Sequence, residues 1–128
     1  MIVADASAIL AILLVEPERE DFVAKLKAAS AIIISPVNYW EVLVRAHTID
    51  GSPGVIQAEE VMRSFDIEVV SIDADNAQLA SQAFARYGKR TPAKLNLGDC
   101  FAYALAKQRN APLLYKGEDF THTDITAA

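Results

Sequence analysis

MIVADASAILAILL, residues 1–14, is an apolar stretch that contains one acid, Asp5. A carboxylate buried by itself is costly unless it is paired or binds a metal ion, so this residue needs a role. The pattern predicts a strand that ends at Ala4, an acid delivered to the edge of a sheet, and a helix behind it. The simplest role for Asp5 is the N-cap of that helix, and Ser7 can share the capping or hydrogen-bond the carboxylate.

Downstream of this stretch, strand-like and helix-like patterns alternate along the chain. β-Branched runs predict further strands at residues 31–34, 67–72 and 112–115, and helical patterns cover residues 17–29, 35–50, 53–65, 73–88 and 98–110. Ser35 followed by Pro36 is typical of a helix start, and Gly88 of a helix end. We therefore expect an α/β protein, a three-layer αβα domain with a central parallel sheet of four to five strands.

The composition fits one globular domain over residues 1–128, without repeats or a linker. Hydrophobic residues make up 52% of the chain, enough for a substantial core. The net charge of −5 excludes a global basic field that would attract nucleic acid. A nucleic-acid substrate would therefore require metal ions or a local basic patch.

The cellular compartment is indicated by two further features. The single cysteine, Cys100, excludes an internal disulfide and a cysteine-rich zinc site, which suits a reducing cytosol. The apolar segment 2–15 lacks a basic leader region and is too short to span a bilayer. We expect a cytoplasmic protein without a membrane segment.

Four acids are candidates for a ligand-binding site at the carboxyl edge of the predicted sheet. Open α/β sheets bind ligands beyond the carboxyl ends of their strands, where the strand order reverses. Asp5 directly follows the first strand and Asp119 follows the fourth, so the two converge if these strands are neighbours. Glu41 lies at the edge of an apolar helical stripe, and Asp99 lies in the first turn of a helix that is apolar almost all round.

Structural roles account for only part of this set. Capping and the helix dipole explain Asp5 and Asp99, whereas Glu41 and Asp119 have only simple solvation as an alternative. Carboxylates that meet in one cleft repel one another unless divalent cations are present, and all-oxygen ligands suit Mg²⁺ or Mn²⁺. Two such ions about 4 Å apart can activate a water molecule and stabilise the leaving oxygen in phosphodiester hydrolysis.

A family resemblance is carried by four motifs, MIVADASAILAIL (1–13), YWEVLV (39–44), LNLGDCFAYALAK (95–107) and LLYKGEDFTHTDI (113–125). With these motifs the chain resembles the PIN-domain ribonucleases, and among them the VapC-type toxins of bacterial toxin–antitoxin pairs. The resemblance implies a PIN-like fold and an endoribonuclease that depends on Mg²⁺ or Mn²⁺. The metal-binding and catalytic acids that it implies are Asp5, Glu41, Asp99 and Asp119, with Glu118 or Asp124 as alternatives for the fourth.

Supporting residues and partners follow from the same resemblance. Ser7 matches a small hydroxyl residue that supports the first acid. Independently of the resemblance, the position of Asn96 just upstream of Asp99 indicates that it either caps the helix or orients a site group. The implied partners are an RNA substrate, a cognate antitoxin protein that occupies or blocks the cleft, and a second copy of the chain in a homodimer.

Surface contacts are harder to assign from the sequence. Lys89, Arg90 and Lys94 can hold the RNA backbone near the cleavage site, and a solvated basic loop is the alternative. Tyr39 and Trp40 are candidates for contacts, with core packing as the alternative for both.

Two other functions remain open on the sequence. A receiver-like signalling domain would use Asp5, Asp73 and Lys116, but the chain lacks the adjacent acidic pair expected after the first strand. That function also leaves Glu41 and Asp99 without roles. A PIN-like binding module without catalysis would keep the fold and would not need the complete acidic set.

Overall fold

Four short parallel strands form the centre of the protein. The computed structural model describes residues 1–128, and the strands are β1 (Ile2–Ala4), β2 (Ile32–Ile34), β3 (Glu68–Val69) and β4 (Leu113–Leu114). They are arranged in the order β3-β2-β1-β4, and every neighbouring pair is parallel. Each strand lies inside a run that the sequence predicts as a strand, so the expected parallel sheet is confirmed.

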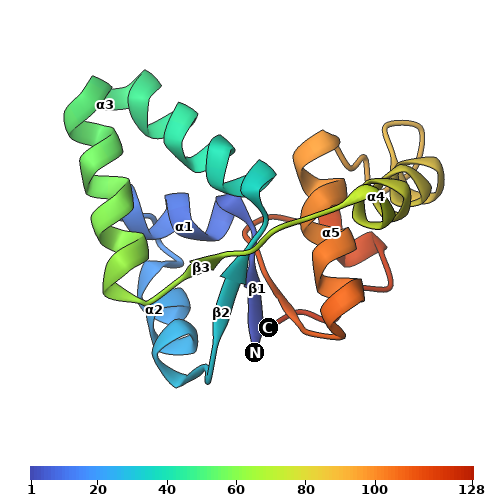
Figure 1. Ribbon diagram of the computed structural model, residues 1–128, viewed down its shortest axis with the longest axis horizontal. Helices are drawn as coiled ribbons and strands as arrows, with labels where there is room; N and C mark the ends of the chain where they lie inside the picture. Colours follow the sequence, from blue (N-terminus) through green and yellow to red (C-terminus); the bar gives the residue numbers. More distant parts are fainter.

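Helices cover both faces of this sheet (Figure 1). They are α1 (Ala6–Leu13), α2 (Arg19–Ala28), α3 (Pro36–Ser64), α4 (Ala74–Tyr87) and α5 (Leu97–Arg109), followed by a short 3-10 turn, η1 (Asp119–His122). Helices α1, α2 and α3 pack on one face and α4 and α5 on the other. Successive residues of a strand point to opposite faces, so Val3 joins the core with α4 and α5 while Ala4 joins the core with α1 to α3. The three-layer prediction is confirmed.

Local sequence signals set most helix ends. Ser35 accepts a hydrogen bond from the backbone N–H of Val37 at 3.2 Å, with Pro36 as the first helical residue. Asp73 caps α4, which ends at Gly88 as predicted. The second helix begins at Arg19, two residues after the expected start at Pro17, and the last begins at Leu97 because Asn96 supplies its N-cap.

Helix α3 is bent into two arms, which the sequence predicts as separate helices. The backbone leaves helical geometry at Asp50 and at Gly51, whose φ of 61° is a left-handed value that favours glycine. Pro53 lies just beyond the bend, where its missing N–H is tolerated at the start of the second arm. A Cβ at Gly54 would lie 2.4 Å from the carbonyl oxygen of Ala46, so the arms approach too closely for a side chain there.

The direction in which successive strands are added to the sheet reverses between β1 and β4. The chain moves outward from β1 through β2 to β3, and then returns to pair β4 with the other edge of β1. The backbone N–H of Asp5 donates to the carbonyl of Leu114 at 2.9 Å, so the carboxyl ends of β1 and β4 lie side by side. The segments that follow β1 and β4 therefore begin at the same edge of the sheet, as expected.

No helix combines the length and the apolar character needed to cross a membrane.

Candidate active site

A cavity of about 460 Å³ opens at the carboxyl edge of the sheet, and three of the predicted acids line it. They reach it from three different elements: Asp5 follows β1, Glu41 lies on the first arm of α3, and Asp99 lies in the first turn of α5. The predicted supporting residues Ser7 and Asn96 line the same cavity. Residues distant in the sequence are thus brought together at one site.

Asp5 combines the structural role and the site role considered for it. It caps α1, and its Oδ2 accepts hydrogen bonds from the backbone N–H of Ser7 at 3.0 Å and from the Ser7 hydroxyl at 2.6 Å. The Ser7 Oγ accepts in turn from the backbone N–H of Lys116 at 2.9 Å, which ties the ends of β1 and β4 together. Only 5% of Asp5 is exposed, and this burial raises the pKa of its carboxyl despite the Ser7 hydrogen bonds.

Glu41 is fixed by a residue that sequence reasoning missed, Asn38. The side-chain N–H groups of Asn38 donate to Glu41 Oε1 at 2.8 Å and to the carbonyl oxygen of Gly98 at 3.0 Å. A Cβ at Gly98 would lie 2.3 Å from both carboxylate oxygens of Glu41, so a side chain here would force this carboxylate to shift. Glu41 is therefore a half-buried, positioned carboxylate, and burial raises its pKa.

A signal for Asn38 was present in the sequence. Asn38 precedes Glu41 by three residues, a spacing that places two side chains on the same face of a helix. Its amide is fully buried, and the Oδ1 atom has no hydrogen-bond partner. A buried polar side chain one turn before an acid is a recognisable sign of a positioned carboxylate.

Asp99 forms a capping box with Asn96 at the start of α5. The Asn96 side chain accepts from the backbone N–H of Asp99 at 2.9 Å, and Asp99 Oδ2 accepts from the backbone N–H of Asn96 at 3.1 Å. Burial, followed by the neighbouring charges of Asp5, Asp119 and Glu41, raises the pKa of Asp99 to about 7. A carboxylate that serves only as a helix cap is stabilised in its charged form, which lowers its pKa. The raised pKa of Asp99 therefore reflects its burial among other acids.

Comparison with known proteins agrees with this arrangement. The sequence profile of the PIN domain matches residues 2–125. The chain belongs to the PIN-domain family. It is 41% identical over 124 residues to VapC ribonuclease Mb0640 of Mycobacterium bovis, covering 96% of this chain and 95% of that protein.

Two solved structures share the fold of this PIN domain. The crystal structure of Mycobacterium tuberculosis VapC20, a sarcin–ricin loop cleaving toxin, superposes with a TM-score of 0.81 at 14% identity, covering 100% of this chain and 98% of that one. A toxin–antitoxin complex from Klebsiella pneumoniae gives 0.72 at 21% identity, covering 100% and 97%. At these identities the likeness shows the fold alone.

The receiver-like alternative is not favoured for a PIN domain with this geometry. It required Asp73 near the site, but Asp73 Oδ1 accepts from the backbone N–H of Asn76 at 3.1 Å and caps α4, away from the cavity lining. Glu41 and Asp99, which that function left without roles, both line the cavity.

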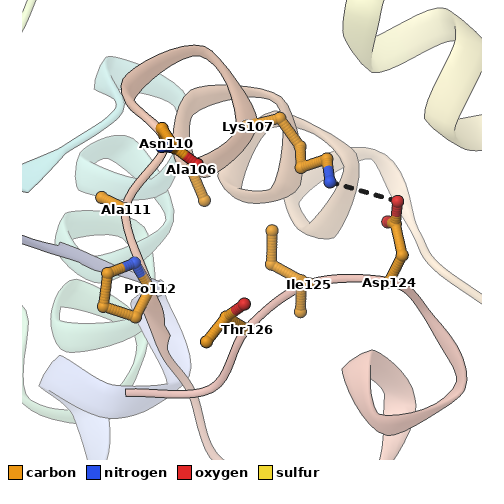
Figure 2. Close-up of a pocket in the computed structure, with 8 residues that line it drawn as sticks. All are labelled: Ala106, Lys107, Asn110, Ala111, Pro112, Asp124, Ile125 and Thr126. Carbon is orange, nitrogen blue, oxygen red and sulfur yellow. Dashed lines mark hydrogen bonds and ion pairs between the residues drawn. The ribbon is translucent and has the colours of Figure 1, made fainter.

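The three candidates for the fourth acid occupy different surroundings in this PIN domain. Asp124 accepts hydrogen bonds from the Tyr103 hydroxyl at 2.5 Å and from Lys107 at 3.1 Å, and it lines a separate small cavity beside Pro112 (Figure 2). Asp119 is exposed at the start of η1 and does not line the acid cavity, yet its charge contributes to the raised pKa of Asp5 and of Asp99. The charge of Glu118 makes no such contribution. Asp119 is the candidate electrostatically coupled to the cavity.

The donor atoms of the site fit a hard divalent cation. They are carboxylate oxygens without any thiolate or imidazole, a set that suits Mg²⁺ or Mn²⁺ rather than Zn²⁺. No three acidic, histidine or cysteine side chains lie close enough together to hold a metal ion by themselves. Mg²⁺ keeps several water ligands and is commonly held by one or two carboxylates together with substrate phosphate, so the open arrangement suits it.

The remaining wall of the cavity is amphipathic and comes mainly from the first arm of α3. Its lining residues are Ala6, Leu10, Trp40, Val44, Arg45 and Thr48. The predicted basic residues Lys89, Arg90 and Lys94 are exposed but do not line it, and Arg45, which sequence reasoning missed, supplies the cation there. Its spacing of four residues from Glu41 was the available signal.

Proposed function

We propose that this PIN domain is an Mg²⁺- or Mn²⁺-dependent endoribonuclease that hydrolyses RNA phosphodiester bonds and acts as the toxin of a toxin–antitoxin pair. The observation that carries the proposal is the meeting of Asp5, Glu41 and Asp99 in one cavity at the carboxyl edge of the sheet. The near full-length similarity to a VapC ribonuclease supports the same reaction.

Each side chain has a distinct part in this proposal. Asp5 and Asp99 would hold the cation, with Glu41 as the third carboxylate and Asp119 as the fourth acid. A bound Mg²⁺ or Mn²⁺ supplies positive charge to the phosphate and activates water for hydrolysis. Ser7 orients Asp5, Asn38 orients Glu41 and Asn96 orients Asp99, each through the hydrogen bonds described above.

Proton occupancy gives the cation a second role. Because its pKa is raised to about 7, the Asp99 carboxylate holds a proton more strongly than an ordinary aspartate does. Cation binding requires the deprotonated form, so the metal competes with this proton and stabilises the charged site. Burial of the Asp99 carboxylate, and then repulsion from the neighbouring acids, favour the binding of a divalent ion that offsets this charge.

The proposed partners follow from the relatives. We propose a cognate antitoxin protein that covers the cleft, by analogy with the Klebsiella toxin–antitoxin complex that shares the fold. We also propose a homodimer, a single nuclease domain over residues 1–128, and action in the cytoplasm, where an RNA substrate is available. The basic residues Lys89, Arg90 and Lys94 remain candidates for contacts to the RNA backbone.

The decisive experiment incubates the purified protein with RNA in Mg²⁺ or Mn²⁺ and then in EDTA, alongside the variants Asp5→Asn and Asp99→Asn. We expect cleavage to require the metal and both acids. Asp66→Asn is a matched control, because Asp66 is exposed, lies outside the cavity and has a positive φ that asparagine tolerates. Cleavage that survives chelation, or both active-site substitutions, overturns the mechanism.

The toxin role has its own test. Expression of the wild-type chain should arrest growth, and co-expression of a small protein encoded beside it should relieve the arrest. The Asp5→Asn variant should be harmless at the same expression level. Harmless accumulation of an active wild-type enzyme contradicts the toxin role while leaving the ribonuclease intact.

A further inference from the structure

We propose that Trp40 and Arg45 form a nucleotide subsite beside the catalytic acids, in which Trp40 stacks on an unpaired base and Arg45 binds a phosphate of the same RNA strand. The subsite presupposes the ribonuclease function proposed above and specifies its substrate as RNA with unstacked bases. Both residues lie on the first arm of α3, on either side of Glu41, and both line the cavity that contains Asp5, Glu41 and Asp99.

Trp40 has no structural role that accounts for its position. Its side chain is 62% exposed, although tryptophan is among the side chains that gain most from burial. It belongs to neither hydrophobic core, pairs with no other aromatic ring, and its indole N–H donates to no protein acceptor. An indole exposed on the wall of an acid-lined cavity is available to a ligand.

The neighbouring residue, Tyr39, points in a different direction on the helix and has a structural role. Tyr39 packs against the core formed with α1 to α3, and its hydroxyl donates to Glu59 Oε1 at 3.3 Å across the bend of α3. The same helix turn therefore holds one aromatic side chain in a structural position and presents the next to the cavity.

Arg45 supplies the charge that a phosphate needs. It is exposed and forms no ion pair with any acid, including Glu41 four residues earlier, and it is the only cationic residue that lines the cavity. A guanidinium presents a planar set of donors that matches phosphate geometry. In a chain with a net charge of −5, a free guanidinium next to three carboxylates marks where the RNA backbone enters.

The chemistry of stacking restricts the substrate. In a double-stranded RNA helix the bases stack on one another and offer only their edges, so an indole ring cannot lie against a base face. Single strands, loops and ends expose those faces, and stacking on them tolerates any base. The subsite therefore favours unpaired RNA and contributes little discrimination among base sequences.

Trp40 is the only tryptophan of the chain, so its intrinsic fluorescence reports the subsite directly. The Asp99→Asn variant, which prevents cleavage during the measurement, is titrated with a single-stranded oligoribonucleotide, with the same backbone lacking bases, and with the corresponding duplex. We expect saturable quenching by the single strand and much weaker quenching by the other two. Equal quenching by the abasic strand, or RNA binding seen by anisotropy without quenching, overturns the proposal.

Substitutions in the wild-type enzyme give a second measurement. Trp40→Leu should weaken RNA binding by about 5- to 150-fold, the range that corresponds to the loss of one stacked base, and Trp40→Phe should restore most of it. Arg45→Gln should weaken binding to all single strands and reduce the slope of log affinity against log salt by about 1. Arg63→Gln, at an exposed position on the second arm of α3, is the matched charge control.

The outcomes separate this subsite from the ribonuclease function. If the wild type cleaves no RNA, the proposed function fails and the subsite with it. If the wild type cleaves single strands and Trp40→Leu cleaves them equally well, only the subsite fails. Sedimentation tests whether Trp40 instead contacts a second copy of the chain or another protein. If the wild type is a dimer, Trp40→Leu is a monomer, and both cleave RNA equally well per chain, the assignment of Trp40 to RNA binding is wrong.

Discussion

Asn38 and Gly98 join two helices through one hydrogen bond, in which the buried amide of Asn38 donates to the carbonyl of Gly98 at 3.0 Å. The same amide nitrogen holds Glu41 Oε1 at 2.8 Å, so one side chain sets the position of the third acid relative to α5. The geometry of the site thus depends on a residue that would not itself contact RNA. Asn38 is a positioning residue in this arrangement.

Replacing Asn38 with alanine should lower metal affinity more than it lowers stability. Glu41 loses its donor, and outer partners of metal ligands typically contribute 10- to 100-fold to affinity or activity. Because Oδ1 of Asn38 has no partner, the substitution leaves only two acceptors without a donor, the Gly98 carbonyl and Glu41 Oε1. Binding of Mn²⁺, followed by calorimetry, measures the effect, and unchanged Mn²⁺ affinity in a folded Asn38→Ala protein contradicts the positioning role.

Gly98→Ala should inactivate the enzyme through Glu41. The new methyl group would lie 2.3 Å from the Glu41 oxygens, so the carboxylate must move away from α5. A double-mutant cycle isolates this effect, since two residues in contact are not additive. In a Glu41→Ala background, Gly98→Ala should cost little further activity. A full additional loss in that background would show that Gly98 acts independently of Glu41.

The features of this structure that can be predicted from the sequence are those that depend on interactions between residues close together in the chain. The helix starts at Ser35 and Asp73 depend on a side chain and a backbone N–H two or three residues away, so the residues themselves reveal them. The meeting of the segments that follow β1 and β4 follows from the topology of parallel sheets once the strands are recognised.

Of the contacts that sequence reasoning missed, Asn38–Glu41 lies within α3 and the others cross between elements. The Asn38–Gly98 hydrogen bond depends on how closely α3 approaches α5, and nothing local to either helix records that distance. The four-residue spacing places Arg45 on the same face of the helix as Glu41. Whether that face lines a cavity depends on the packing of the helices, which the spacing does not record. Residues 60 positions apart become neighbours only when the core is assembled.

The stability of the metal-free protein should fall as the pH rises from about 4 to 7. The ordinary pKa of an aspartate side chain is 3.8, and burial raises that of Asp99 to about 7. Between these values the folded chain binds more protons than the unfolded chain, so raising the pH favours unfolding. Asp99→Asn keeps a hydrogen-bond acceptor for the cap and removes the charge. At pH 8 it should therefore raise the free energy of unfolding by about 1–2 kcal/mol, allowing for partial solvent screening.

Urea unfolding in EDTA between pH 4 and pH 8 measures whether the free energy of unfolding falls as the pH rises. The wild type should lose stability relative to Asp99→Asn as the pH increases, and added Mg²⁺ should restore the wild type alone. Parallel pH curves for the two proteins contradict the raised pKa of Asp99 in the folded chain. The variant should remain inactive at every pH, so the gain in stability comes with the loss of cleavage.

Asp119 and Asp124, two candidates for the fourth acid, should differ in what their substitution affects: cleavage for Asp119 and stability for Asp124. Asp119→Asn should reduce cleavage because its charge acts on Asp5 and Asp99, and it should hardly affect stability because the side chain is exposed. Asp124→Asn should preserve cleavage and lower stability by at most about 1 kcal/mol at neutral pH, because it removes a partly exposed ion pair with Lys107.

The pH dependence of the Asp124 effect has the opposite sign to that of Asp99. Hydrogen bonds from Tyr103, and then from Lys107, lower the pKa of Asp124 below its ordinary value of 3.8. The stability it contributes is therefore present above pH 4 and is lost as the pH falls through the lowered pKa. Thermal unfolding at pH 7 and at pH 2 should show a larger difference between wild type and Asp124→Asn at pH 7 than at pH 2. If Asp124→Asn abolished cleavage while Asp119→Asn did not, the fourth acid would have to be assigned to Asp124 instead.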